Sequence, residues 1–149
     1  MVCLYCNQEL AVSNSRPQKS RNQVWRRRPC KACGAVFTSI ESIDLSKALV
    51  VIKPAASGEA PTLSAFERDK LFISLYESLR HRPAAASDAR GLCDTVVAHI
   101  IKKATHGNIS PRTIFSLTLN TLTRFDAAAA THYAAFHPSS AQITSNGRN

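Results

Sequence analysis

Four cysteines of the chain form two pairs with identical internal spacing. Cys3-Leu-Tyr-Cys6 and Cys30-Lys-Ala-Cys33 are both CxxC motifs, and 23 residues separate them. Two residues between thiolates let one tight turn present both sulfurs to a single ion, and two such turns complete a tetrahedral S4 site. A redox dithiol would explain one pair but not two. The spacing therefore predicts a structural zinc ion held by Cys3, Cys6, Cys30 and Cys33.

The residues that follow the two pairs support the same prediction. Asn7 and Gly34 stand where a metal-binding turn often needs a positive φ, and both residue types tolerate that conformation. A module of about 45 residues buries too little surface to fold unaided, so metal binding would supply the missing free energy. The fifth cysteine, Cys93, falls on a predicted helix and is expected to be a small core residue.

Basic residues crowd against the second cysteine pair. Three consecutive arginines precede Cys30, and further cations occupy the segment before them. Compensation of the negative charge of an S4 zinc site is one explanation, but the cations extend well beyond it. A zinc-held ribbon would present guanidiniums to phosphates or guanine edges. The predicted DNA-binding residues are Arg16, Lys19, Arg21, Arg26, Arg27, Arg28 and Lys31.

Strand alternation divides the arginines between two faces. If residues 24–28 form a strand, Arg26 and Arg28 share a face with Val24, whereas Arg27 lies beside Trp25. Trp25 has two equally good interpretations, stacking on a base or sugar and packing in a small core. Ser13, Asn14 and Ser15 add polar groups suited to contacts with the nucleic-acid backbone.

The charge of the whole chain also favours an anionic partner. It has 149 residues, a formal net charge of +9 and a pI near 9.8. Residues 1–47 hold 8 of its 19 Lys and Arg but only 3 of its 10 Asp and Glu. Nucleic acid is therefore the first candidate. No apolar run approaches the roughly 18 residues of a membrane span, and no signal peptide is recognisable, so we expect a cytoplasmic, nucleoid-associated protein.

The sequence divides into a cysteine-bearing module and a helical one. Strands are expected at Val24–Arg28 and Ala35–Ile40, and a further strand, Ala48–Lys53, would open the second module. The predicted fold class is α+β, with a small N-terminal β zinc ribbon followed by a mainly helical domain. The expected boundaries are 1–47 for the ribbon, 48–137 for the second domain and 138–149 for a disordered tail.

Four helices are expected in the second module. Ser64 and Glu67 suggest a capping box before a helix that ends near Arg82. A second helix is expected after Ser87. Ser110, followed by proline, predicts the start of a third helix, and Asp126 predicts the start of the last. We find no paired acid and base, no open metal site and no partnered nucleophile, so an enzyme is not expected.

The N-terminal pattern CLYC…SRP…WRRRPCKACGAVFTSIE resembles the zinc ribbon of the NrdR-type repressors, bacterial regulators of ribonucleotide reductase genes. The second module resembles an ATP-cone, the nucleotide-binding domain of that family. The resemblance implies binding of ATP or dATP by Val51, Ile52, Lys53, Lys70 and Arg82. Pro54 replaces a basic residue of the family pattern, and Ser64 stands in place of a glutamate.

The resemblance implies a homo-oligomeric, zinc-dependent repressor that binds an operator in double-stranded DNA. ATP or dATP in the cone would change how subunits associate, and hence how pairs of ribbons are spaced along the duplex. Two other functions remain open from the residues themselves. One is an RNA-binding or ribosome-associated zinc-ribbon protein. The other is a dimeric DNA-binding regulator whose helical domain binds no nucleotide.

Overall fold

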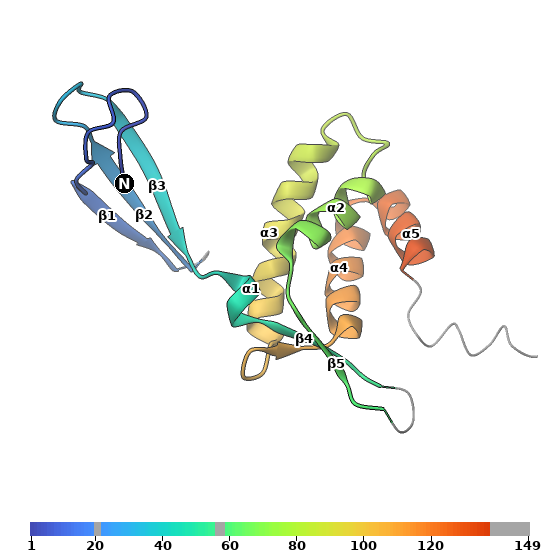
Figure 1. The fold of residues 1–149 in the computed structure, drawn as a ribbon. Helices are drawn as coiled ribbons and strands as arrows, with labels where there is room; N and C mark the ends of the chain where they lie inside the picture. Colours follow the sequence, from blue (N-terminus) through green and yellow to red (C-terminus); the bar gives the residue numbers. More distant parts are fainter. Residues whose placement is uncertain (20–21, 56–58, 138–149) are drawn as a thin grey trace, which may run out of the picture. The chain divides into compact units, whose positions relative to one another are not determined.

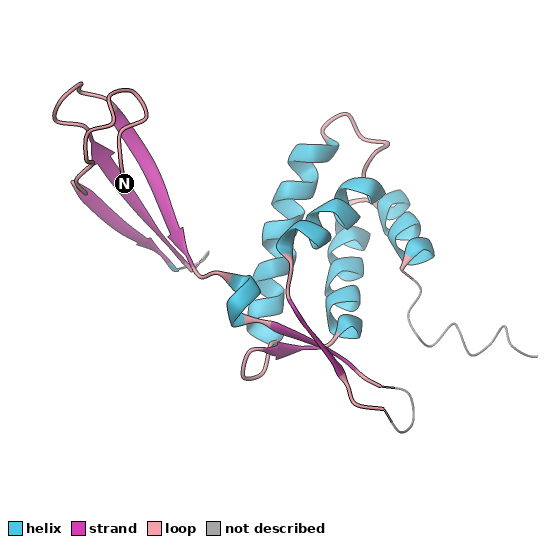
Figure 2. Ribbon diagram, in the orientation of Figure 1, coloured by secondary structure: helices cyan, strands magenta, loops and turns pink. Residues whose placement is uncertain are grey.

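A computed structural model describes residues 1–19, 22–55 and 59–137 of the chain. Two compact units divide the chain, Met1–Asp44 and a second unit that begins at Leu45. The first is a β-sheet unit and the second contains the α-helices (Figures 1 and 2). The predicted α+β class is confirmed. Arg21 and the predicted tail 138–149 lie outside the described residues.

Unit 1 is a three-stranded antiparallel sheet with the order β1-β2-β3. Its strands are β1 (Asn14–Gln18), β2 (Gln23–Pro29) and β3 (Val36–Ser42). Both predicted strands are confirmed, and β1 is a further strand that the sequence did not predict. β1 contains no apolar alternation and all five of its residues are exposed. Its pairing with β2 therefore depends on backbone hydrogen bonds and tertiary context rather than on strand propensity.

Unit 2 combines a small sheet with a helical core. Its sheet contains β4 (Val50–Lys53) between antiparallel β5 (Thr62–Ala65) and parallel β6 (Asn108–Ile109). This sheet lies at one end of the two longest helices (Figure 1). The helices are α1 (Leu45–Ala48), α2 (Arg68–Ser78), α3 (Ala85–Lys103), α4 (Pro111–Phe125) and α5 (Ala127–Phe136).

The core of unit 2 lies among its four long helices. The fully buried side chains there include Leu75 on α2, Leu79 directly after α2, Ile100 on α3 and Leu122 on α4. Burial of such side chains is the main term that stabilises this unit. Cys93 is 0% exposed within this core, as its predicted role requires. Among the described residues, no helix is long and apolar enough to cross a membrane.

Two of the predicted helix starts are confirmed, and one is wrong. Ser110 accepts a hydrogen bond from the N–H of Thr113, and Asp126 accepts one from the N–H of Ala129. Ser64 instead lies in β5, opposite Val51, because its backbone pairs with β4 in the sheet. α2 therefore starts at Arg68, with Glu67 as its N-cap and no side-chain capping bond.

Three further boundaries differ from expectation. α2 ends at Ser78 rather than near Arg82. Ala48 ends helix α1 rather than opening a strand, and β4 begins at Val50. α3 begins at Ala85 instead of after Ser87, because alanine residues with high helix propensity extend it toward its N-terminus. These corrections move a boundary by two to four residues and leave the type of each element unchanged.

Candidate metal centre and nucleic-acid interface

The structure gathers the four predicted cysteine ligands into one cluster. Their sulfur atoms all lie within 4.8 Å of one another. Cys3 Sγ lies 3.6 Å from Cys33 Sγ, and Cys6 Sγ lies 3.5 Å from Cys30 Sγ. These separations are too long for a disulfide and close to the roughly 3.8 Å expected between sulfurs that share one tetrahedral zinc ion.

Both cysteine pairs sit on turns with the same backbone geometry. The N–H of Asn7 donates to the carbonyl of Cys3, and the N–H of Gly34 donates to that of Cys30, each at 3.0 Å. Asn7 has φ 57° and Gly34 has φ 75°, so the positive φ predicted for both positions is confirmed. Each of the two matching turns contributes two of the four sulfurs, which is the donor arrangement of a closed S4 site.

The backbone of the second turn also favours the thiolate form of its first cysteine. The N–H of Cys33 lowers the pKa of the Cys30 thiol to about 6, although burial opposes this effect. Zinc binds thiolates rather than thiols, so the lowered pKa favours the ligand form of Cys30 itself. All five cysteines of the chain are free of disulfides. The donor set and its spacing therefore fit one structural zinc ion.

The core of unit 1 is very small and centres on this cluster. Its buried residues are Cys3, Leu10 and Cys30, with Ala35 and Phe37 packed partly against them. A core of this size cannot offset the conformational entropy of more than 40 ordered residues. Metal binding would provide the missing stabilisation, as the sequence predicts.

The predicted DNA-binding residues fall into two groups that differ in their contacts. Arg26 donates from Nη2 to Glu41 Oε2 at 2.7 Å, and it also contacts Ser15 Oγ at 3.3 Å. Arg28 donates from Nε to Ser39 Oγ at 2.8 Å. Both arginines are partly buried. These partners are not predictable from the sequence alone, because they become apparent only once the register of β1 and β3 is known.

The remaining cations of unit 1 are exposed. Arg16 lies on β1, Arg27 on β2, Lys19 directly after β1 and Lys31 in the second cysteine turn. Among the residues that the structure describes, no side-chain hydrogen bond or ion pair involves any of these four. These side chains are therefore free to contact an anionic partner.

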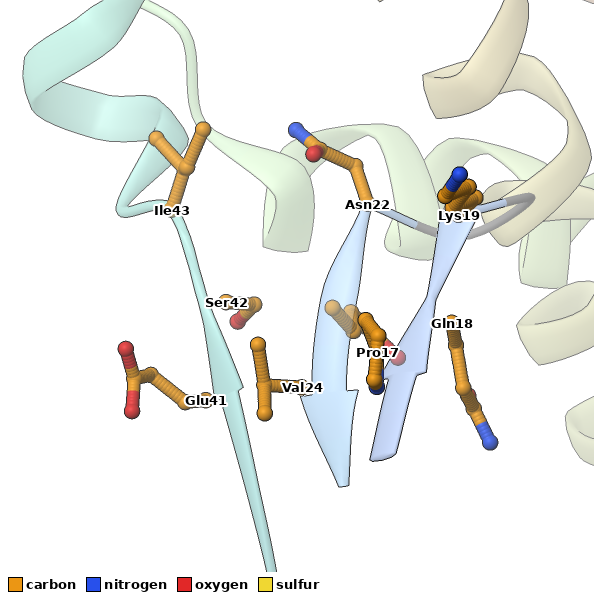
Figure 3. Close-up of a pocket in the computed structure, with 9 residues that line it drawn as sticks. Pro17, Gln18, Lys19, Asn22, Val24, Glu41, Ser42 and Ile43 are labelled. Carbon is orange, nitrogen blue, oxygen red and sulfur yellow. The ribbon is translucent and has the colours of Figure 1, made fainter. Parts of the chain in front are cut away.

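A hollow of about 320 Å³ occupies the end of the sheet remote from the cysteines. Figure 3 shows Pro17, Val24 and Glu41 along it, one from each strand, with Lys19 and Asn22 near the β1–β2 connection. Its lining mixes one carboxylate with one amine and has no cluster of metal ligands. It contains none of the three consecutive arginines, so the hollow and the arginine run are separate features.

The predicted nucleotide-binding residues are distributed over several elements of unit 2. Val51, Ile52 and Lys53 lie on β4, with Lys53 exposed at its end. Lys70 lies in the first turn of α2, where its amine contacts Glu67 Oε1 at 2.8 Å. The side chain of Lys70 is 75% exposed, so this pair holds it only weakly.

Arg82 is much more firmly engaged. Its Nε donates to Asp88 at 2.7 Å and its Nη1 to Asp126 at 3.0 Å. Its guanidinium carbon also lies 4.7 Å from the centre of the Phe125 ring. The hydrogen bonds to Asp88 and then Asp126 raise the pKa of Arg82 further above its ordinary value. A phosphate at Arg82 would have to compete with two carboxylates.

Comparison with known proteins shows which family shares the cysteine-bearing unit and most of the chain. The family model described as the N-terminal domain of transcriptional repressor NrdR-like proteins matches residues 1–41. The transcriptional repressor NrdR of Rhodospirillum centenum is 30% identical over 145 residues, which cover 97% of this chain and 90% of that protein. The NrdR repressors of Pelagibacter ubique (30% identical; 92% of this chain, 86% of that protein) and Gluconacetobacter diazotrophicus (33%; 92% and 74%) are also similar. The chain therefore belongs to the NrdR family of transcriptional repressors, a family of regulators and not of enzymes.

Proposed function

We propose that this repressor binds one structural zinc ion and, through the unit that the zinc organises, an operator in double-stranded DNA upstream of ribonucleotide reductase genes. The observation that carries the proposal is the closed cluster of four cysteine sulfurs at one end of an arginine-bearing sheet. The family relationship supports the target genes and a cytoplasmic location.

The cysteines would act on DNA binding only indirectly. Cys30 follows β2 directly, and Cys33 precedes β3 by two residues, so ligands on this turn fix how the two strands leave it. Cys3 and Cys6 tie the N-terminus to the same point. A closed S4 site leaves no position for substrate or water, so its role is scaffolding. The exposed arginines of the sheet then supply the contacts to phosphates and base edges.

We further propose that ATP or dATP regulates repression by changing the association of identical subunits. Lys53 and Lys70 are the exposed cations of the predicted site, and Val51 and Ile52 are the half-buried residues that precede Lys53 on β4. A nucleotide shifts such an equilibrium only by its different affinity for the two assemblies. Subunit association sets the spacing of paired ribbons, which must fit the helical repeat of the operator.

A regulator that binds no nucleotide is the second candidate. Two observations favour it: Pro54 replaces a basic residue of the family pattern, and Arg82 is held by two carboxylates. In that case unit 2 would serve subunit association alone.

Native mass spectrometry of the full chain, with and without ATP and dATP, tests the metal and nucleotide together. We expect one zinc ion per chain, bound nucleotide and a change in subunit number. Zinc with no nucleotide and a constant assembly would support the second candidate and overturn nucleotide regulation.

Selection from a random duplex DNA library tests DNA binding separately. We expect enrichment of a paired-box sequence and loss of binding after treatment with a zinc chelator. Structured RNA of similar length is the control. Stronger binding to that RNA, or no enriched duplex, would contradict the repressor mechanism and favour an RNA-binding zinc ribbon.

A further inference from the structure

The sheet of unit 1 has two faces with different chemistry. We call them the Trp25 face and the Arg26 face. Strand alternation and the observed register assign the side chains of β1, β2 and β3 to one face or the other. The Trp25 face contains Asn14, Arg16, Gln18, Gln23, Trp25, Arg27, Pro29, Val36, Thr38, Ile40 and Ser42. The Arg26 face contains Ser15, Pro17, Val24, Arg26, Arg28, Phe37, Ser39 and Glu41.

The polar groups of the Arg26 face are largely engaged with one another. Glu41, the one acidic residue of the three strands, accepts two hydrogen bonds from Arg26. Ser39 accepts one from Arg28. Phe37 packs against the cysteine cluster and lies 5.5 Å from the ring of Tyr5. This face therefore carries the small core and a neutralised arginine, and a phosphate approaching it would meet a carboxylate.

The Trp25 face has free cations and no acidic residue. Arg16 and Arg27 are exposed, and among the described residues neither side chain has a hydrogen bond or ion pair. Asn14 lies directly opposite Arg27, and Arg16 lies directly opposite Trp25. Each of these pairs brings side chains to about 5 Å at Cβ, so the four form one compact group.

An apolar strip accompanies this group on the same face. Ile40 is opposite Trp25 and is 61% exposed, and Val36 on the same face is 50% exposed. Arginine and asparagine are the side chains best suited to guanine and adenine edges, and apolar groups contact the thymine methyl. Free cations, amides and an uncovered apolar strip together match the mixed surface of a DNA groove.

We propose that the Trp25 face is the surface that enters the groove of duplex DNA, with Arg16, Arg27 and Asn14 as the contacting residues. Arg26 and Arg28, although part of the same arginine run, are positioning residues that brace the strands. The assignment rests on the proposed DNA-binding function and specifies its orientation. A sheet can dock in this way, since β-ribbons are known to read the groove of duplex DNA.

A matched pair of variants tests the assignment. Arg27→Gln and Arg26→Gln remove one positive charge from adjacent positions of β2, on opposite faces. Affinity is measured on the duplex enriched by the wild-type chain, at several salt concentrations, after zinc content and thermal stability have been compared. We expect Arg27→Gln to weaken binding roughly 10- to 100-fold and to reduce the salt slope by about one. We expect Arg26→Gln to weaken it less than about threefold.

Glu41→Gln provides a second readout that does not depend on removing an arginine. It takes the carboxylate away from the Arg26 face. If that face met the DNA, the variant would bind about tenfold more tightly; we expect a change of less than threefold.

Fluorescence gives a third readout, because Trp25 is the one tryptophan of the chain. We expect the duplex to shift or quench its emission in the wild-type chain and in Arg26→Gln. Unchanged emission at saturating DNA, tighter binding by Glu41→Gln, or equal losses in the two arginine variants would overturn the assignment. Failure of the wild-type chain to bind any duplex would instead overturn the proposed function.

Discussion

Asp126 joins three parts of unit 2 at a single side chain. Its Oδ1 accepts from the N–H of Ala129, and its Oδ2 accepts from Arg82 and His81. The bond from Ala129, followed by that from His81, holds the pKa of this carboxyl well below its ordinary value of 3.8. A lowered pKa in the folded state means that ionised Asp126 stabilises the fold above about pH 4, and that this contribution is lost as the pH falls further.

Two substitutions separate the roles of Asp126. Asp126→Asn keeps an oxygen for the helix cap but loses the charge that pairs with Arg82, whereas Asp126→Ala loses both. We expect Asn to lower the melting temperature of the helical signal at pH 7 and Ala to lower it more. The difference in melting temperature between the wild-type chain and either variant should become smaller below pH 4. A gap of the same size at pH 3 and pH 7 would exclude ionised Asp126 as its origin.

At the level of elements, the sequence predicted those that have a local signal. β2 and β3 flank a cysteine turn and contain β-branched or aromatic residues, and α4 and α5 start at residues that cap them. β1 has no such signal, because its only local features are polar residues and Pro17. Its existence depends on the partner strand, and so does the division of the arginines into free and engaged groups.

The Ser64–Glu67 pattern is the opposite case: the local sequence predicts a helix start, but tertiary structure prevents it. Serine followed three residues later by glutamate favours a capping box. Here the pairing of β5 with β4 extends the chain through Ser64 and delays the helix until Arg68. The metal ligands were predictable because the CxxC spacing places two sulfurs on each of two turns, whereas the binding face required the register.

The turn between α3 and β6 depends on one glycine. Gly107 has φ +76°, and a Cβ there would lie 2.9 Å from the carbonyl oxygen of Ala48. The carbonyl oxygen of Gly107 accepts a hydrogen bond from the N–H of Val50, so the turn connects the start of β4 to β6. Gly107→Ala should therefore strain the backbone by roughly 1–2 kcal/mol and also push it away from Ala48. We expect a fall in melting temperature of at least about 4 °C.

Gly91 is the matched control, since it lies inside α3 and a Cβ there would meet nothing within 4 Å. Gly91→Ala should raise the free energy of unfolding by about 0.5–1 kcal/mol, because alanine loses less conformational entropy in a helix. Equal effects of the two substitutions would contradict a special conformational requirement at position 107.

At the scale of the whole molecule, the two units derive their stability from different sources. Unit 2 has a broad apolar core, whereas unit 1 buries little more than two cysteines and Leu10. Loss of one cysteine ligand should therefore unfold unit 1 and leave unit 2 folded. Cys30→Ser is the test, and Cys93→Ala, which changes a cysteine of the helical core, is its control.

Each unit has its own spectroscopic signal. Trp25 lies in unit 1 and the long helices lie in unit 2, so tryptophan emission reports the first and far-UV circular dichroism the second. We expect Cys30→Ser to shift Trp25 emission to that of an exposed indole, abolish DNA binding and leave the helical melting transition in place. Cys93→Ala should instead lower the free energy of unfolding of unit 2 by about 1–2 kcal/mol, because it removes a buried sulfur. Trp25 emission should remain that of the wild-type chain. Joint loss of both signals in Cys30→Ser would mean that the units fold cooperatively, so that the metal site stabilises the regulatory unit as well as the ribbon.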